Sequence, residues 1–270
     1  MATLLLALPA FTPDAGRPPC ALADARAQAA CEINHRSGKR ERHLARMAKC
    51  DFTTEPRIQL LMLSEGPDPD HMRLIDNTTI RAQACEVREG NGVWQFQRIG
   101  PFSTRGGNSW TSVVTAHDES LHSQWHVSHE GRASLFVGDY VLGTADASGD
   151  LIGYPPIHQH HWHYFHASDF RRDFLAVHGD NTCPGRDGAY CMFVEYPNGS
   201  AFELVPQLGM QAEFNDVRPS GSPPLEWYAF GGLFIHDPSL SRPRAAIAGC
   251  NAERRCETGR TTAQGGCTWK

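Results

Sequence analysis

The chain has 270 residues, of which 40% are hydrophobic and 20% are charged, and its formal net charge is −5. These values are ordinary for a globular protein with a buried core, and the acidic balance argues against nucleic acid as a partner, because nucleic-acid-binding proteins usually carry a basic excess. Nowhere do 18 apolar residues run together, so no transmembrane segment is expected.

Residues 1–55 are predicted to form an N-terminal lead-in. It opens with a short apolar run that could be a weak signal peptide or a remnant of one. The following stretch, 21–50, is rich in Ala, Arg, Lys and Glu, which favours helix. Its basic cluster at 39–49 indicates either a solvated helix packed on the domain, the commoner case, or a basic docking segment.

Residues 56–236 predict one β-domain built from short strands. Clusters of Gly, Pro, Asn and Asp separate the runs of strand-forming residues. The expected strands are 57–63, 92–98, 109–116, 133–142, 157–166, 174–178, 190–196, 201–205, 210–214 and 225–234. Many short strands with turn residues between them predict an all-β, antiparallel sandwich or barrel, with helix confined mainly to the lead-in.

The nine cysteines are scattered along the chain and form no Cys-x-x-Cys pair. This spacing weakens a zinc-finger interpretation and suits disulfides in an oxidising compartment, so we expect secretion or an endomembrane lumen. Cys183 and Cys191 flank a short Pro/Gly loop and are expected to pair. Residues 237–270 are predicted to be an irregular tail that contains three further cysteines.

The most distinctive segment is 158–166, where five of the 14 histidines occupy nine residues. Neutral imidazole is the commonest protein ligand for zinc, copper and iron. The candidate metal ligands here are His158, His160, His161 and His163. Simple strand alternation predicts that His158 and His160 share one face and that His161 and His163 share the other. An incidental surface cluster is the alternative, but the flanking aromatic residues favour a specific site.

Two further residues are candidates to complete the metal site. Glu213 lies in the middle of an expected strand among apolar neighbours, where its carboxylate either faces the histidines or faces solvent. His178 ends the expected strand that follows the histidine tract. A mixed site of histidine and carboxylate ligands is therefore one prediction, and a solvent-facing strand side is the other.

Residues 155–228 resemble the first copper domain of the ascorbate-dependent copper monooxygenases, the group of peptidylglycine α-hydroxylating and dopamine β-monooxygenase. The stretches that carry the resemblance are His160-His161-Trp162, Cys183 to Cys191, Pro197-Asn-Gly, Gln211-Ala-Glu-Phe and Pro224-Leu-Glu-Trp-Tyr228. The resemblance implies a jelly-roll-like β-sandwich that binds copper. It also implies hydroxylation of an activated C–H bond of a small-molecule or peptide substrate with O2 and ascorbate.

The chain departs from that family at three points. Glu213 stands where the family has its third copper histidine, Trp162 stands where it has a methionine, and the second copper domain has no clear counterpart. A carboxylate ligand shifts metal preference away from Cu(I) towards Zn(II), Fe(II) or Cu(II). The resemblance also pairs His160 with His161, and adjacent residues on a strand need a bulge or a twist to converge.

Two alternatives stay open. The cupins also place His-x-His on a jelly-roll strand, but here no glutamate follows at the distance that their motif requires. A non-catalytic module that uses metal or histidines for structure or partner binding is the alternative from another class. The number of open coordination positions separates a catalytic site from a structural one.

Overall fold

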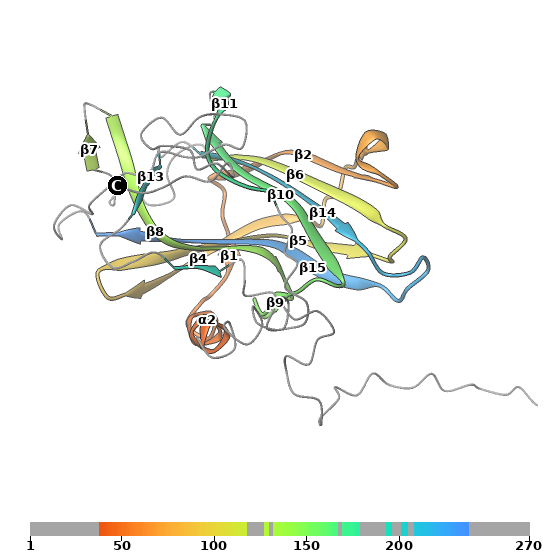
Figure 1. The fold of residues 1–270 in the computed structure, drawn as a ribbon, viewed down its shortest axis with the longest axis horizontal. Helices are drawn as coiled ribbons and strands as arrows, with labels where there is room; N and C mark the ends of the chain where they lie inside the picture. Colours follow the sequence, from red (N-terminus) through yellow and green to blue (C-terminus); the bar gives the residue numbers. More distant parts are fainter. Residues whose placement is uncertain are drawn as a thin grey trace, which may run out of the picture.

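The computed structural model describes residues 38–117, 127–129, 132–166, 169–178, 193–195, 201–204 and 208–237. In these residues, two antiparallel β-sheets pack face to face, and a helix, α2 (Lys39–Met47), lies outside one of them (Figure 1). The only helical turn found later in the described segments is the short 3-10 turn η1 (Pro69–His71). The predicted all-β sandwich with a short helical lead-in is therefore confirmed.

The larger sheet has nine strands in the described part of the chain. Its main path runs β1-β4-β5-β15-β8-β12, and three short strands pair with β8 beside that path. The bounds are β1 (Thr53–Thr54), β4 (Arg81–Glu89), β5 (Gly92–Thr104), β15 (Leu225–His236), β8 (Arg132–Ala145), β12 (Phe193–Val194), β7 (Val127–His129), β9 (Leu151–Ile152) and β13 (Phe202–Leu204).

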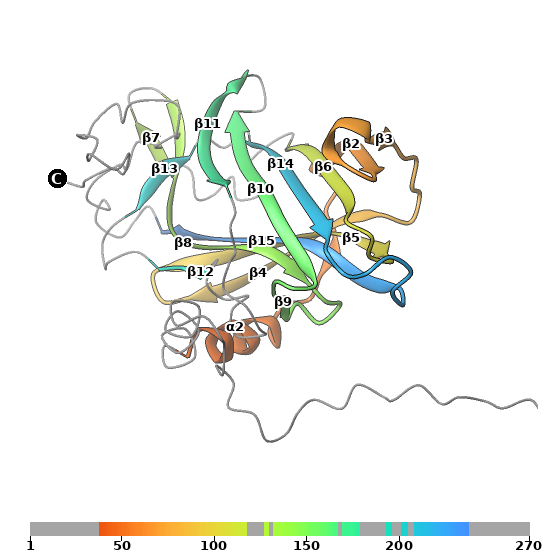
Figure 2. The same ribbon diagram turned by 45° about the vertical axis from the view of Figure 1, so that its right-hand side comes forward.

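The smaller sheet has six strands among the described residues, in the order β11-β10-β14-β6-β2-β3. Figure 2 shows β10, β14 and β6 side by side, with the larger sheet behind and below them. The bounds are β11 (Asp169–His178), β10 (Ile157–His166), β14 (Leu208–Asp216), β6 (Ser109–His117), β2 (Ile58–Gly66) and β3 (Arg73–Leu74).

The core between the sheets fixes which way β10 faces. Trp162 and Tyr164 of β10 are fully buried there, and the Trp162 ring meets that of Phe214 at 6.2 Å. Phe214 in turn contacts Trp227 of the larger sheet, with ring centroids 5.2 Å apart. A Cβ on Gly231 would lie 2.9 Å from the Trp162 ring, so the absence of a side chain there lets the sheets approach. Large aromatic side chains of this kind dominate core energetics.

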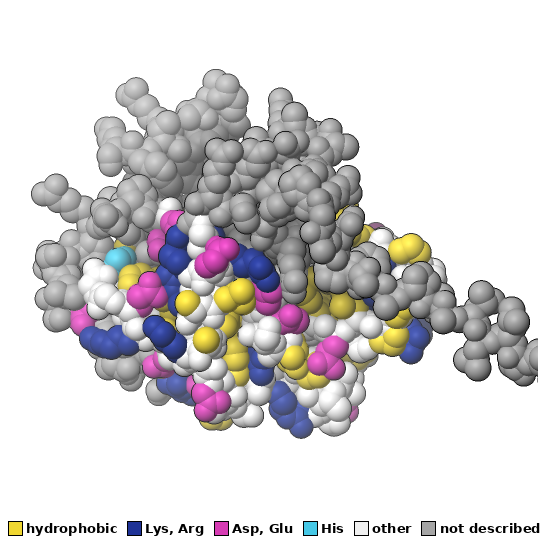
Figure 3. All heavy atoms as spheres, turned by 90° about the horizontal axis from the view of Figure 1, so that it is seen from below, with side chains coloured by type: hydrophobic (Ala, Val, Ile, Leu, Met, Phe, Trp, Pro, Cys, Tyr) yellow, Lys and Arg dark blue, Asp and Glu magenta, His cyan; other side chains and the backbone are white. Residues whose placement is uncertain are grey.

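The basic helix α2 packs on the outer face of the larger sheet. Arg40 pairs with Asp150 at 2.7 Å, and Arg46 pairs with Glu89 at 2.6 Å while its guanidinium lies 4.6 Å above the ring of Trp94. Figure 3 views this side of the molecule, and basic and acidic side chains are interspersed over its described part. The basic segment therefore forms a helix packed on the domain, as the commoner of the two interpretations predicted.

The lead-in is joined to the β-domain more tightly than the predicted boundary at residue 55 implies. The β1 strand inside the lead-in pairs with β4, and Cys50 forms a disulfide with Cys85 of β4, with Cα atoms 5.6 Å apart. The β4 strand is missing from the predicted strands, although its buried Ala82, Ala84 and Val87 mark it as half-buried.

Several predictions fall on residues outside the described segments. These include the Cys183–Cys191 pair and the tail, of which residue 237 alone is described. No described helix is long and apolar enough to cross a membrane.

Candidate metal centre

A β-bulge in β10 determines how its histidines are presented. In the pairing with β14, Gln159 lies opposite Phe214 and His161 lies opposite Glu213, so His160 is the extra residue between two paired positions. Gln159 and Trp162 both face the core with no exposed surface, although they are three residues apart. Strict alternation cannot place both inside, and the inserted residue resolves the mismatch.

The bulge brings all four candidate histidines of the tract to the outer face. His158, His160, His161 and His163 are each half-buried, while the residues between them at 159 and 162 are buried. Successive ring centroids along this row are 5.8, 4.0 and 5.6 Å apart. The expectation from simple alternation, with two histidines on each face, is therefore wrong, and the bulge brings the adjacent side chains of His160 and His161 together.

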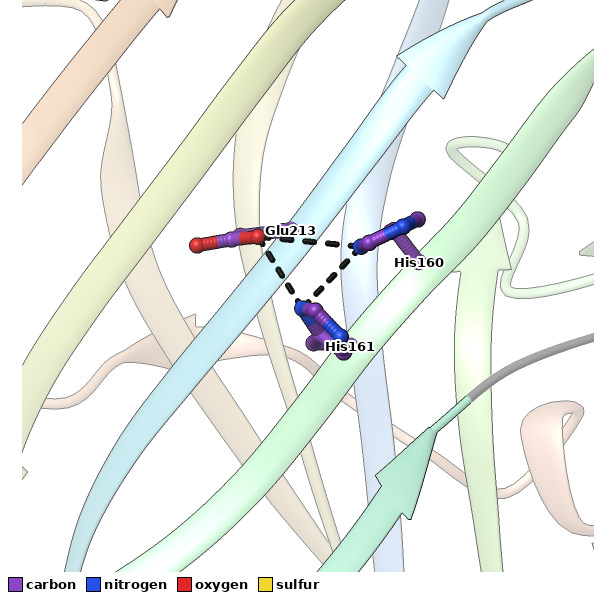
Figure 4. Close-up of side chains that lie close together, drawn as sticks. All are labelled: His160, His161 and Glu213. Atoms are coloured by element: carbon purple, nitrogen blue, oxygen red, sulfur yellow. Dashed lines mark hydrogen bonds and ion pairs between the residues drawn. The ribbon is translucent and has the colours of Figure 1, made fainter. Parts of the chain in front are cut away.

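Glu213 of β14 faces the middle of the histidine row (Figure 4). The Nδ1 atoms of His160 and His161 are 3.0 Å apart, and Oε2 of Glu213 lies 3.1 Å from His161 Nδ1 and 3.9 Å from His160 Nδ1. Among the described residues this trio is the group of metal-binding side chains whose ligand atoms converge within 4.8 Å. Of the two orientations considered for Glu213, the structure has the one that faces the histidines.

Hydrogen bonds alone satisfy His160 Nδ1, His161 Nδ1 and Glu213 Oε2 poorly. Each imidazole Nδ1 carries either one hydrogen or one lone pair in the ring plane. If His161 Nδ1 accepts a hydrogen from His160, it has none to donate to Glu213. If His161 Nδ1 carries the hydrogen instead, His160 Nδ1 and Glu213 Oε2 must both accept that one hydrogen. The lone pair of His160 Nδ1 and the negative charge of the Glu213 carboxylate then face each other at 3.9 Å. A cation between the three atoms would be attracted to all of them.

The spacing also suits a metal ion. Ligand atoms about 2.0–2.1 Å from a tetrahedral ion are separated by about 3.4 Å. The three observed separations, 3.0, 3.1 and 3.9 Å, lie on both sides of that value. The side chains of His160, His161 and Glu213 are 39%, 30% and 20% exposed, so an ion held by them would keep access to solvent.

Neighbouring residues on the outer face orient the histidines. The ring of Trp110, on β6, meets that of His160 edge to face with centroids 4.9 Å apart. His158 Nδ1 lies 2.9 Å from Asn215 Oδ1, and the Asn215 amide nitrogen donates to Asn108, which has a positive φ of 60° in the turn before β6. These contacts fix the ring orientations of His158 and His160 on the outer face.

The structure brings some predicted site residues together and leaves others apart. His160, His161 and Glu213 converge, whereas His158 and His163 extend the row on either side of them. The backbone of His178 lies directly opposite His161 in the pairing of β10 with β11, but its side chain is outside what the structure describes.

Sequence reasoning missed one residue of the site, Trp110. Gln211 and Asn215 lie two positions before and after Glu213 on β14, and alternation along the expected strand already predicts that all three share one polar face. Trp110 reaches the site through pairing of β6 with β14, which has no local signature in the sequence.

Comparison of the chain with models of protein families, with curated proteins and with solved structures finds no match. The function must therefore be argued from the site itself.

Proposed function

We propose that this protein binds one divalent transition-metal ion through His160 Nδ1, His161 Nδ1 and Glu213 Oε2. The observation that carries the proposal is the convergence of these three atoms at ion-binding distances on a partly exposed sheet face. Zn(II), Fe(II) and Cu(II) are the ions suited to two imidazoles and a carboxylate, whereas Cu(I) prefers softer ligands.

The three ligands found among the described residues favour an open, catalytic type of site over a closed, structural one. Structural zinc sites are usually closed by four protein ligands, whereas catalytic sites have three and leave a position for water or substrate. Two histidines and one carboxylate are also the ligands of non-haem iron oxygenases. A bound ion would supply Lewis acidity or an oxygen-binding position, while the three side chains would hold it at the surface of the sheet.

The oxidative function proposed from the family resemblance is hydroxylation of an activated C–H bond with O2 and ascorbate. Its support is the adjacent histidine pair presented by a bulge, with Glu213 in the place of the third ligand. A non-catalytic metal-binding module is the alternative. We further propose an oxidising compartment, secreted or lumenal, for which the Cys50–Cys85 disulfide is the support.

The test is Zn(II) binding measured by equilibrium dialysis and metal analysis. We expect one equivalent in the wild type and affinity reduced by roughly 100-fold or more in His160→Ala and Glu213→Gln, because loss of an outer-shell partner alone costs about 10–100-fold. His71→Ala is the matched control, since exposed His71 contacts Asp68 at 2.8 Å and belongs to no converging group of three ligands within the described residues. Equal affinity in all four proteins would show that the site is wrong.

A second measurement separates the oxidative proposal from its alternative. Wild-type protein that has been loaded with copper and dialysed to remove unbound copper should consume O2 with ascorbate faster than Glu213→Gln treated in the same way. Equal rates of O2 consumption would contradict the proposed oxidative chemistry but would not contradict the proposal of metal binding.

A further inference from the structure

We infer that Gln211 is a positioning residue that holds Glu213 as a one-oxygen ligand and so keeps a coordination position of the ion open. The inference rests on the proposed metal site and extends it to a residue that provides no metal-binding atom. It concerns the geometry of the site rather than its existence, so the two can fail separately.

The hydrogen bond that carries the inference has a defined direction. Gln211 and Glu213 are two residues apart on β14 and project from the same outer face, as alternation requires. Gln211 Nε2 lies 3.0 Å from Glu213 Oε1. A carboxylate only accepts hydrogen bonds, so the amide nitrogen must be the atom facing it. The contact is charge-assisted, which makes it stronger than a bond between neutral groups.

The two carboxylate oxygens of Glu213 consequently have different partners. Oε1 is bound to Gln211, while Oε2 faces His161 Nδ1 at 3.1 Å. With Oε1 held in this way, an ion between the histidines would meet one oxygen of Glu213. Among the described residues it would then have three protein ligands, which leaves space for a fourth from solvent or substrate. Without Gln211, the carboxylate can rotate and present both oxygens to the ion, which raises the coordination number.

Gln211 contributes little to the core, so its removal should leave the fold intact. Its side chain is half-buried on the outer face, and its backbone pairs with Val114 of β6 and His163 of β10. These backbone hydrogen bonds do not depend on the side chain. Methionine is close to glutamine in length and flexibility and lacks the amide donor. Gln211→Met therefore removes the hydrogen bond with little change in shape.

The experiment uses Co(II) as the probe, because its visible absorption is strong in four-coordinate sites and weak in five- or six-coordinate ones. Gln211→Met should bind Co(II) about 10–100-fold more weakly, as is typical when an outer-shell partner is lost, and its visible band should weaken. Gln59→Met, the same change at an exposed position of β2, is the control and should match the wild type in affinity and spectrum.

The outcomes separate the two proposals. A wild-type protein that binds no Co(II) would overturn the metal site and this inference with it. If the wild type and Gln211→Met bind Co(II) with equal affinity and the same spectrum, the metal site stands and the inference falls. Weaker binding with an unchanged band would also overturn it, because the coordination number would not depend on Gln211.

Discussion

The histidines on the outer faces of the two sheets differ in how far they are buried and in what they contact. On the larger sheet, α2 covers a second apolar cluster, and His43 is fully buried among Phe96, Phe193 and Phe230. Its Nε2 donates to the carbonyl oxygen of Gly149 at 2.8 Å. On the smaller sheet, four histidines form a half-exposed row beside a carboxylate.

This contrast shows that its surroundings decide whether a histidine packs in a core or is accessible as a ligand. Burial lowers the pKa of His43 to about 4, so the ring stays neutral at physiological pH, where it packs like an aromatic side chain. The histidines of the row keep access to solvent and face one another and Glu213. We therefore expect changes on the covered face to alter stability, and changes on the open face to alter metal binding.

The largest expected effect is on the covered face. Trp94→Ala removes a ring that is 1% exposed, stacks on Phe96 at 5.3 Å and lies beneath the Arg46 guanidinium. The free energy of unfolding should fall by about 3–5 kcal/mol, measured by urea denaturation. The folded fraction should retain the wild-type Zn(II) stoichiometry. Loss of both stability and metal binding in the folded fraction would contradict the separation of the two faces.

The next effect is a pH dependence that originates at His43. Its folded-state pKa of about 4 lies below the ordinary value of 6.5, so between these values the unfolded chain binds a proton that the folded chain does not. Stability is therefore complete above pH 6.5 and is lost as pH falls towards 4, by roughly 3 kcal/mol. His43→Gln should reduce the difference in unfolding free energy between pH 7 and pH 4 by about that amount. An unchanged difference would contradict this origin.

Buried His117 acts in the same direction, because burial also lowers its pKa to about 4. It is unchanged in His43→Gln, so the comparison between the two proteins isolates the contribution of His43.

On the open face, metal should stabilise the folded protein. At a Zn(II) concentration about 100 times the dissociation constant, the expected gain is about 2.7 kcal/mol, because the ion binds the folded state preferentially. Thermal melts with and without Zn(II) measure it. The gain should fall to about 0.4 kcal/mol or less in Glu213→Gln, whose affinity is expected to be about 100-fold lower, and should persist in His71→Ala. A shift of equal size in Glu213→Gln would place the stabilising ion elsewhere.

The smallest effect is expected for Arg42→Ala on α2. The Arg42 and Glu195 side chains form an ion pair but are 43% and 36% exposed, so solvent screens their attraction. The free energy of unfolding should change by at most about 1 kcal/mol, measured by the same denaturation. A loss comparable to that of Trp94→Ala would mean that this exposed pair, rather than the aromatic cluster, holds the helix in place.

Part of the site can be predicted from the sequence alone. The histidine tract, its location on a strand and the polar face that carries Glu213 follow from residue type and from alternation along a strand, whereas alternation leaves open whether Glu213 faces the histidines or solvent. The bulge also has a sequence signal, because Ile157 and Trp162 are both apolar and an odd number of residues apart. Both are buried in the core, which an uninterrupted strand does not allow.

By itself, the sequence determined the class of fold, the lead-in helix and the candidate ligands, because secondary-structure propensity and hydrophobic patterning are local properties. Only the tertiary structure decided that Glu213 faces the histidines, that Cys50 pairs with Cys85 and that Gln211 contacts the Oε1 atom of Glu213. Each of these depends on which strands become neighbours and in which register. Register is set by burying the two inner faces together, so it depends on segments that are far apart in the chain.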